Sequence, residues 1–310
     1  MAKGYLLVAV GVTGNVGPLT TAFVSLLFAL PVHWCTYRPL RSGWSIWRSA
    51  LIRGIAQGVN HMAFQFVLRW VRLQVMQPLL FLVSSGFMIA PDAVRDTRKK
   101  TRNSTAFWPM LSMLGTWALW PILALLGIWL LVSDADGGEG GVFSEAVPEV
   151  HVLGQEIPVW ALGVGALIIT STTYAYLHRN LEALKPDLKG PVASVGMVYA
   201  VAILAVGAWA TEGGWGGMTG GNWSYLLICA ATGVIGGYLS GVQTVKAYEQ
   251  RLRASTTAML EPLSTMAGIL LGMFVEKAAP TSLGVVGIVI IFIASCGAAK
   301  YQSQSRPDSE

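Results

Sequence analysis

The chain has 310 residues, of which 54% are hydrophobic and only 12% are charged, and its formal net charge is +5. Soluble domains carry about 25% charged residues, so this composition argues against a water-soluble enzyme and indicates an integral membrane protein. The 35 glycines and 12 tryptophans fit closely packed spans with aromatic side chains at the membrane interfaces. Three well-separated cysteines predict neither a disulfide nor a zinc site, and we interpret them as small core residues: Cys35, Cys229 and Cys296.

Apolar runs of about 20 residues, the length that crosses a bilayer, recur along the chain. Ahead of them, residues 4–14 form an apolar segment that is too short to cross alone. It is either a truncated first span or an extension of the next helix. We therefore predict an all-α membrane protein with nine or ten transmembrane helices. The expected spans are 15–37, 50–69, 73–93, 106–132, 158–177, 191–211, 223–245, 255–275 and 281–299.

The connections between these spans alternate in charge. One set is basic, and we place Arg38, Arg53, Arg98 and Lys189 in it, whereas the other set contains an acidic loop at 134–156. Short loops rich in Lys and Arg stay on the cytoplasmic side of a membrane. We therefore expect a multi-pass protein of the cytoplasmic membrane with an external acidic linker at 133–157. The C-terminus, including a tail at 301–310, is expected in the cytoplasm.

Comparison of the chain with itself indicates an internal repeat, 1–132 and 158–300. The charge-based orientation makes the matching helices cross the membrane in opposite directions. Inverted-topology repeats of this kind are typical of secondary transporters, with substrate bound near the midplane. Chance recurrence of Gly, Pro and Trp is the alternative. The matches, in chain order, are Gly17-Pro18 with Gly190-Pro191, Trp44-Ser45, Gly54 and Gly58 with Trp223-Ser224, Gly233 and Gly237, and Gln77-Pro78-Leu79 with Glu261-Pro262-Leu263.

Glycines spaced four residues apart mark two of the expected spans, Gly54 and Gly58 on one and Gly233, Gly237 and Gly241 on the other. Small residues at this spacing let two helix backbones approach closely. We interpret them as helix-packing positions. A hinge that lets two halves of a transporter rock is the alternative.

Polar side chains within apolar spans give the candidate site. Gln57 and His61 lie four residues apart, so they share one face of a helix. Tyr174 and Tyr238 lie deep in their expected spans and could pack around an organic substrate. The full set of candidate substrate-binding residues is Gln57, His61, Gln77, Tyr174, Tyr238, Gln243 and Glu261.

Two of these residues could couple transport to protons. His61 changes charge near physiological pH, but it could equally be a neutral imidazole that is hydrogen-bonded across helices. Glu261 has three interpretations: a proton-coupling carboxylate, a partner for a cationic substrate group, or an acid at a helix start near the cytoplasmic interface. In the third case the helix dipole stabilises its negative charge.

The C-terminal region resembles a known family. Glu261-Pro262 opens an expected helix that Gly272 and Glu276 close, and Gly284 and Gly287 follow in the last span. This pattern resembles the second repeat of the drug/metabolite transporter superfamily, with the EamA branch as the closest match. Asp92 follows Pro78 at the same spacing as Glu276 follows Pro262. The resemblance implies ten spans with both ends inside, from which the short first segment departs.

The sequence lacks a phosphate-binding glycine loop and a spaced cluster of metal ligands, so we expect no cofactor, no metal and no enzymatic activity. Anionic lipid and the orientation rule explain the basic run at 95–102 without nucleic acid. We expect a secondary transporter that exports a small organic metabolite or drug-like solute, driven by the proton gradient or by the solute's own gradient. The alternatives are a lipid-linked substrate carrier or flippase and a non-transporting membrane scaffold. The expected partners are the solute, the lipid bilayer and protons, and the oligomeric state is open between a monomer and a homodimer.

Overall fold

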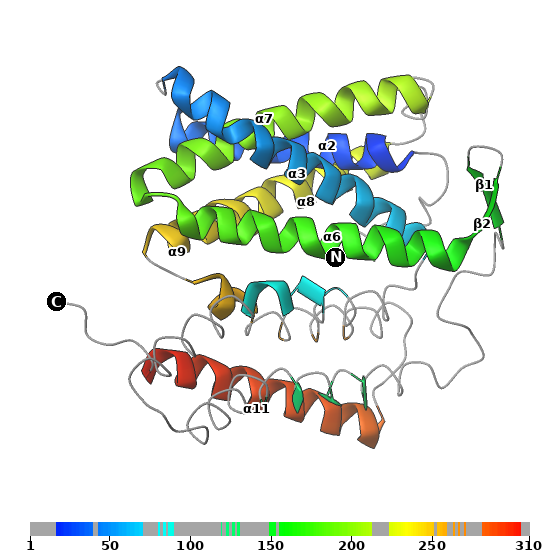
Figure 1. The fold of residues 1–310 in the computed structure, drawn as a ribbon, viewed down its shortest axis with the longest axis vertical. Helices are drawn as coiled ribbons and strands as arrows, with labels where there is room; N and C mark the ends of the chain where they lie inside the picture. Colours follow the sequence, from blue (N-terminus) through cyan, green and yellow to red (C-terminus); the bar gives the residue numbers. More distant parts are fainter. Residues whose placement is uncertain are drawn as a thin grey trace, which may run out of the picture. The chain divides into compact units, whose positions relative to one another are not determined.

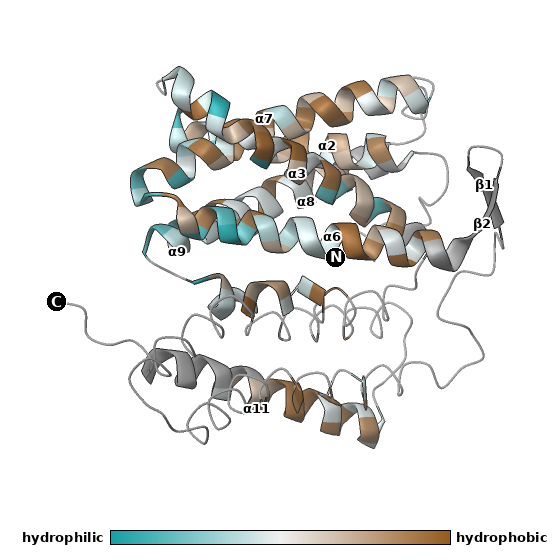
Figure 2. Cartoon of the chain, in the orientation of Figure 1, coloured by the Kyte–Doolittle hydropathy of each residue, from teal (hydrophilic) through white to brown (hydrophobic). Residues whose placement is uncertain are grey.

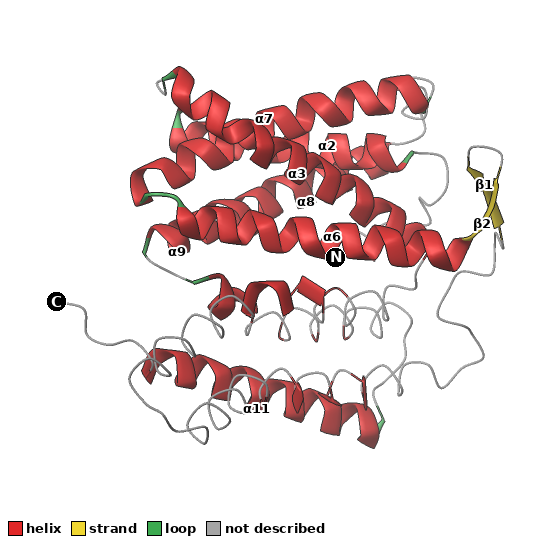
Figure 3. Cartoon of the chain, viewed as in Figure 1, coloured by secondary structure: helices red, strands yellow, loops and turns green. Residues whose placement is uncertain are grey.

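The computed structural model describes the chain in several stretches, and almost all of the described residues are helical (Figures 1 and 3). Expected spans at 73–93, 106–132 and 255–275, and the short segment at 4–14, lie mostly or wholly outside these residues. The described residues are 17–39, 43–70, 80, 83–84, 86–89, 119, 122–123, 126–127, 129–130, 149–152, 155–212, 223–250, 253–258, 263, 266, 270 and 281–304.

Three helical stretches are long and apolar enough to cross a membrane: Leu19–Tyr37, Pro186–Thr211 and Leu227–Glu249. These stretches confirm the prediction of a helical protein that associates with a membrane. Figure 2 shows apolar residues along much of α7. The helices are α2 Pro18–Tyr37, α3 Trp44–Trp70, α6 Val159–Ala183, α7 Pro186–Thr211, α8 Trp223–Gly236, the π-helix η3 Gly237–Val242, α9 Gln243–Glu249 and α11 Ser282–Gln304.

The chain forms two compact units, Met1–Val71 with Ser144–Leu252, and Arg72–Phe143 with Arg253–Glu310. Each unit combines segments from both halves of the sequence. The predicted repeats at 1–132 and 158–300 are a different division of the chain, and they stay a prediction. In the second unit, a Cβ added to Gly127 would lie 2.8 Å from the carbonyl oxygen of Gly287, so α11 packs closely there.

The expected linker at 133–157 contains secondary structure that the sequence analysis does not predict. Strands β1 (Glu149–Val152) and β2 (Gln155–Pro158) pair as an antiparallel hairpin, with Val150 opposite Ile157. Figure 3 shows this hairpin directly before α6.

Helix α2 lies against α8 and η3 through the glycines at spacing four. A Cβ added to Gly233 would lie 2.6 Å from the carbonyl oxygen of Ser25, and one added to Gly237 would lie 2.9 Å from the Cβ of Ala29. Ser25 and Ala29 follow each other on α2 in the same chain order as Gly233 and Gly237 on the other side of the contact. Helices α2 and α8 therefore run parallel. The absence of side chains at the two glycines is what lets the backbones approach this closely.

Helices α3 and α7 make a second contact of the same kind. A Cβ added to Gly54 would lie 2.7 Å from the carbonyl oxygen of Gly196, and one added to Gly58 would lie 3.6 Å from the Cα of Ala200. These partners also follow each other in the same chain order, so α3 and α7 run parallel. The interpretation of both glycine pairs as packing positions is confirmed.

A carboxylate at the end of α7 caps the start of α2. Glu212 accepts hydrogen bonds from the backbone N–H of Leu19 at 2.8 Å, from that of Thr20 at 2.9 Å and from the Thr20 hydroxyl at 2.6 Å. Gly17 leaves room for this carboxylate, because a Cβ there would collide with it. A negative charge at a helix N-terminus satisfies free N–H groups and interacts favourably with the helix dipole. Helices α2 and α7 are therefore antiparallel.

The apolar core of the first unit lies between α2, α7 and α8, where Phe23, Leu204 and Cys229 are buried. On the outward side of α7, Val206 and Trp209 are exposed, as a lipid-facing surface requires. The interpretation of the cysteines as core residues is correct for Cys229 and wrong for Cys35 and Cys296, which are exposed.

We predict that Gly233→Ala lowers the melting temperature of the purified protein. The added methyl group meets a backbone carbonyl, which cannot rotate away, and overpacking of this kind costs about 1–3 kcal/mol. The matched control is Gly165→Ala on α6, where no atom lies within 4 Å of the added Cβ. Alanine has a higher helix propensity than glycine, so the control variant should be as stable as the unmodified protein or more stable. Equal melting temperatures for both variants would contradict the packing role of Gly233.

We also predict that Glu212→Ala destabilises the protein by about 0.5–2 kcal/mol, because three donors at the start of α2 lose their acceptor. Thermal unfolding in detergent measures this effect. Glu249→Ala is the control, because among the described residues this carboxylate makes no hydrogen bond or ion pair and acts on Tyr37 and Lys189 only at longer range. A Glu212→Ala melt that matches the Glu249→Ala melt would contradict the capping role.

Candidate functional site

Polar side chains line the contact between α3 and α6. Arg53, Gln57, Asn60 and His61 follow one another at helical spacing and share one face of α3. Arg53 bonds to Leu177, whereas Asn60, later on α3, bonds to Thr170, which is earlier on α6. The two helices are therefore antiparallel. Gln57 lies between the two contacts, at the level of Thr173 and Tyr174.

Arg53 is buried in this contact, with 6% of its surface exposed. Its Nη1 donates to the carbonyl oxygen of Leu177 at 2.8 Å and to Oδ1 of Asn180 at 3.2 Å. Its Nε is buried and has no acceptor. The aliphatic part of the side chain packs on Gly196, where an added Cβ would lie 3.3 Å from Cγ and Cδ of Arg53.

The energetic balance at Arg53 is close to zero. Burying a charged group costs several kcal/mol even after the protein relaxes. Hydrogen bonds from a charged donor return about 1.5–3 kcal/mol each. Arg53 has two such bonds, both to neutral acceptors, and no carboxylate pairs with it in the described part of the chain. Its contribution to stability is therefore small.

Asn60 and Gln57 continue the polar contact toward the other end of α3. Asn60 Nδ2 donates to the carbonyl oxygen of Thr170 at 2.7 Å and to Oγ1 of Thr173 at 3.0 Å. Gln57 Oε1 is buried without a hydrogen-bond donor. A buried amide oxygen without a donor is uncommon in folded proteins. The Gln57 level is therefore a position where a further polar group would be stabilised.

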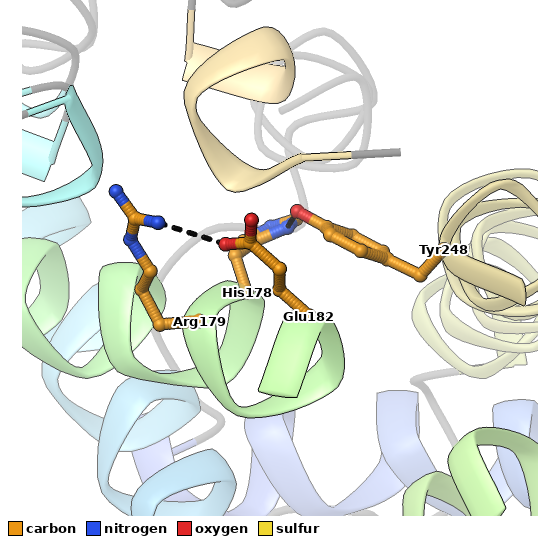
Figure 4. A network of polar contacts seen from close by, with 4 residues as sticks. All are labelled: His178, Arg179, Glu182 and Tyr248. Carbon is orange, nitrogen blue, oxygen red and sulfur yellow. Dashed lines mark hydrogen bonds and ion pairs between the residues drawn. The ribbon is translucent and has the colours of Figure 1, made fainter. Parts of the chain in front are cut away.

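Helix α6 also contacts α9 through polar side chains (Figure 4). His178 Nδ1 lies 2.9 Å from the hydroxyl oxygen of Tyr248, and both side chains are buried. The Tyr174 ring packs against His178 in a tilted geometry, with ring centroids 4.4 Å apart. Lys189, from the first turns of α7, donates its Nζ to the carbonyl oxygen of Tyr248 at 2.7 Å. These contacts join α6, α7 and α9 within one unit.

An ion pair lies beside these contacts in Figure 4, between Arg179 Nη1 and Glu182 Oε2 at 2.8 Å. Both side chains are partly exposed and lie three residues apart on α6. A pair of this type contributes less than about 1 kcal/mol. The pair engages the carboxylate of Glu182, which lies near the buried basic groups.

The predicted site residues are only partly brought together. Gln57 and His61 lie on the face of α3 that meets α6, where Tyr174 lies. Gln243 begins α9 and is half-buried, whereas Tyr238 in η3 is 47% exposed. Gln77 and Glu261 lie outside the described residues, so their roles stay predictions.

Two basic residues that the sequence analysis places in cytoplasmic loops belong to helices instead. Arg53, which also falls within the expected span 50–69, lies more than two turns inside α3, because this helix begins at Trp44. Lys189 lies in α7, which begins at Pro186 rather than at residue 191. Both are buried. The loop assignment is wrong because the helices extend past the apolar runs, and the long aliphatic side chains pack between helices.

The sequence analysis also misses two buried histidines. His178 lies one turn from the end of α6, and His33 lies one turn from the end of α2, where its ring fills the space beside Gly241. Hydropathy treats both as residues near span ends. The one available signal is the spacing of Tyr174 and His178, which places the two rings on the same side of α6.

The π-helix η3 lies between the glycine contact and the His178–Tyr248 pair. The backbone N–H of Gln243 donates to the carbonyl oxygen of Tyr238, five residues earlier. Single π turns inside α-helices occur frequently at functional sites. Tyr238 and Gln243, two of the predicted site residues, lie at its two ends. Among the described residues, no group of His, Cys, Asp and Glu could hold a metal ion.

No protein-family model matches the chain, and no curated protein matches it. Ten chains of solved structures match, and one of them is described only as "Crystal structure of protein". That chain is 14% identical, with a TM-score of 0.60, and the match covers 99% of this chain and 95% of the other. A likeness at this identity shows a shared fold and nothing about function.

We predict that Tyr248→Phe destabilises the protein by about 1–3 kcal/mol. The change leaves a buried ring nitrogen of His178 without its hydrogen-bond partner. Tyr176→Phe on α6 is the control, because that side chain is 38% exposed and makes no hydrogen bond among the described residues. Thermal unfolding of both variants measures the difference. A Tyr248→Phe protein as stable as the control would show that the contact contributes nothing.

Proposed function

We propose that this protein is a secondary active transporter of the drug/metabolite transporter type, similar to the EamA branch. It moves a small organic metabolite or drug-like solute across the cytoplasmic membrane, in the direction of export, by alternating access. Two inverted repeats build it, and its C-terminus lies in the cytoplasm. Two observations support the proposal: the sequence resemblance and the helix packing of the first unit.

The observation that carries the proposal is that the two glycine contacts correspond under the repeat. Gly54 and Gly58 of α3 match Gly233 of α8 and Gly237 at the start of η3, without a gap in the sequence. Their partners also correspond, because Gly196 and Ala200 on α7 follow Ser25 and Ala29 on α2 at one constant offset. That offset is two residues shorter than the one between the Gly-Pro pairs at 17–18 and 190–191.

The helix directions support an inverted repeat. Helices α2 and α8 run parallel, as do α3 and α7, whereas α2 and α7 are antiparallel. Helix α3 therefore runs opposite to α8, its match in the repeat. A direct duplication would place matching helices in the same direction, so this arrangement favours an inverted one. Secondary transporters use such pairs because exchange of two equivalent packings opens the site alternately to each side.

The polar contact between α3 and α6 provides a route for a solute. Polar side chains inside membrane spans are costly, and they usually mark a substrate or ion pathway. Arg53, Gln57 and Asn60 continue along two turns of α3, so a solute could exchange hydrogen bonds stepwise with them. A membrane scaffold that transports nothing would have no use for these polar side chains inside the helix contact.

We predict that purified protein in liposomes moves at least one small organic solute, and that the flux saturates with solute concentration. Thermal-shift screening against a metabolite library identifies the solute first, because a ligand that binds the folded state raises its melting temperature. Flux of the hits is then measured with and without a pH gradient, with empty liposomes as the control.

Two variants test coupling in the same assay. Loss of the pH-gradient effect in Glu261→Gln or His61→Gln would assign coupling to that residue, whereas unchanged flux in Glu261→Gln would remove Glu261 from the mechanism. Hits that bind without crossing would contradict transport and favour a scaffold. Translocation of lipid-linked compounds alone would favour a carrier of lipid-linked substrates.

A further inference from the structure

We infer that Arg53 is the binding group for an anionic group of the transported solute, a carboxylate or a phosphate. This inference rests on the proposed transport function and names the substrate class of that protein. It differs from the sequence-based hypothesis, in which the carboxylate of Glu261 selects a cationic group or carries a proton.

The first reason is the unused hydrogen-bonding capacity of Arg53. A guanidinium carries N–H donors on all three nitrogens, arranged in a planar fork. The contacts with Leu177 and Asn180 both use Nη1, while Nε is buried and has no acceptor. The fork therefore has at least one buried donor, on Nε, that no protein acceptor uses. Carboxylates and phosphates bind such a fork with two parallel hydrogen bonds.

The second reason is the local charge balance. Lys189 lies in the same unit, 4% exposed, and its Nζ is also bonded to a neutral carbonyl oxygen. The carboxylate of Glu182 pairs with Arg179, and that of Glu212 caps α2 at the opposite end of α7. Among the described residues, no carboxylate forms an ion pair with Arg53 or Lys189, although the charges of Glu182 and Glu249 act on Lys189 at longer range. An anionic solute would supply the negative charge that Arg53 lacks.

The third reason is the chemistry beside the guanidinium. The His178 ring packs in a tilted geometry between the rings of Tyr174 and Tyr248, next to the segment of α6 that Arg53 contacts. Flat rings of this kind can accept the apolar part of an organic anion. The arrangement fits a small solute with an apolar body and one acidic group better than it fits an inorganic ion.

The position of Arg53 fits entry from the basic end of the unit. Arg53 lies about 13 Å along α3 from its first residue, at 1.5 Å per residue. That end of α3 carries the exposed Arg48 and lies at the expected cytoplasmic side. An exporter collects its solute from this side. The exposed cations would attract an anion, and the buried one would bind it.

The test is chemical labelling of arginine by phenylglyoxal in protein reconstituted in liposomes. Modification of Arg53 blocks trypsin, so mass spectrometry detects it as a longer peptide that spans Arg53. We expect Arg53 to react, because a transport site opens to water, and we expect Arg48 to react as an exposed internal control. An unreactive Arg53 beside a reactive Arg48 would overturn the inference.

Matched probes then identify the chemistry that Arg53 recognises. Benzoate is compared with benzamide, and phenyl phosphate with phenol, as protectants during labelling. We expect at least one anion to slow modification of Arg53 several-fold, with no protection by its neutral counterpart and none at Arg48. Protection by benzoate alone indicates a carboxylate site, and protection by phenyl phosphate alone indicates a phosphate site. Equal labelling with every probe would overturn the inference.

A variant separates binding from a structural role. Arg53→Met keeps the side-chain length and removes the charge, and we expect its melting temperature to fall by no more than about 2 °C or to rise. The same variant should lose the thermal shift that a protecting anion produces in the unmodified protein. Arg48→Met is the control and should keep it. A large fall in the Arg53→Met melting temperature would show that Arg53 serves mainly to hold α3 against α6, and it would overturn the inference.

The same liposomes separate this inference from the proposed function. Saturable flux of a neutral or cationic solute with an unprotected Arg53 would overturn anion binding and leave transport intact. A chain that moves no solute at all would contradict transport first.

Discussion

The close approach of helix backbones at glycine positions is the constraint on which the first unit depends. In a membrane, the lipid chains are as apolar as a leucine side chain, so helices associate through tight packing rather than through exclusion of water. Gly233 and Gly237 hold α2 against α8 and η3, and Gly54 and Gly58 hold α3 against α7. The second pair also places α3, which carries Arg53, Gln57 and Asn60, beside α7.

Tight packing also decides how the buried polar groups are satisfied. Arg53 lies beside Gly196, where a larger residue would displace its aliphatic chain, and its Nη1 reaches the carbonyl oxygen of Leu177 instead of water. Lys189 likewise uses a backbone carbonyl as its acceptor. Backbone acceptors are neutral, so they accommodate a cation without neutralising it. The first unit therefore holds positive charge in its interior at little gain or loss in stability.

The sequence predicted much of the fold and less of the site. Hydropathy located α2, α7 and the α8 region, and the spacing of Gly54, Gly58, Gly233 and Gly237 predicted the helix contacts. It misplaced Arg53 and Lys189, because a rule that counts loop charges assumes that charged side chains leave the membrane. The His178–Tyr248 pair joins distant segments, and no local pattern reports such a contact. Gln57 and Tyr174 were singled out because polar residues interrupt apolar helices there, and their role in a substrate site stays a prediction.

The wide turn of η3 keeps its glycines facing α2 over a longer distance than a regular α-helix would. In an α-helix of 3.6 residues per turn, positions four apart rotate around the axis by about 40° at each step, so a straight row of them soon turns away from its neighbour. The i to i+5 bond at Gln243 adds residues to one turn and reverses this drift. Gly241 thereby still faces His33, two steps after Gly233. The wide turn therefore keeps Gly241 against α2 and leads directly into the segment whose Tyr248 meets His178 on α6.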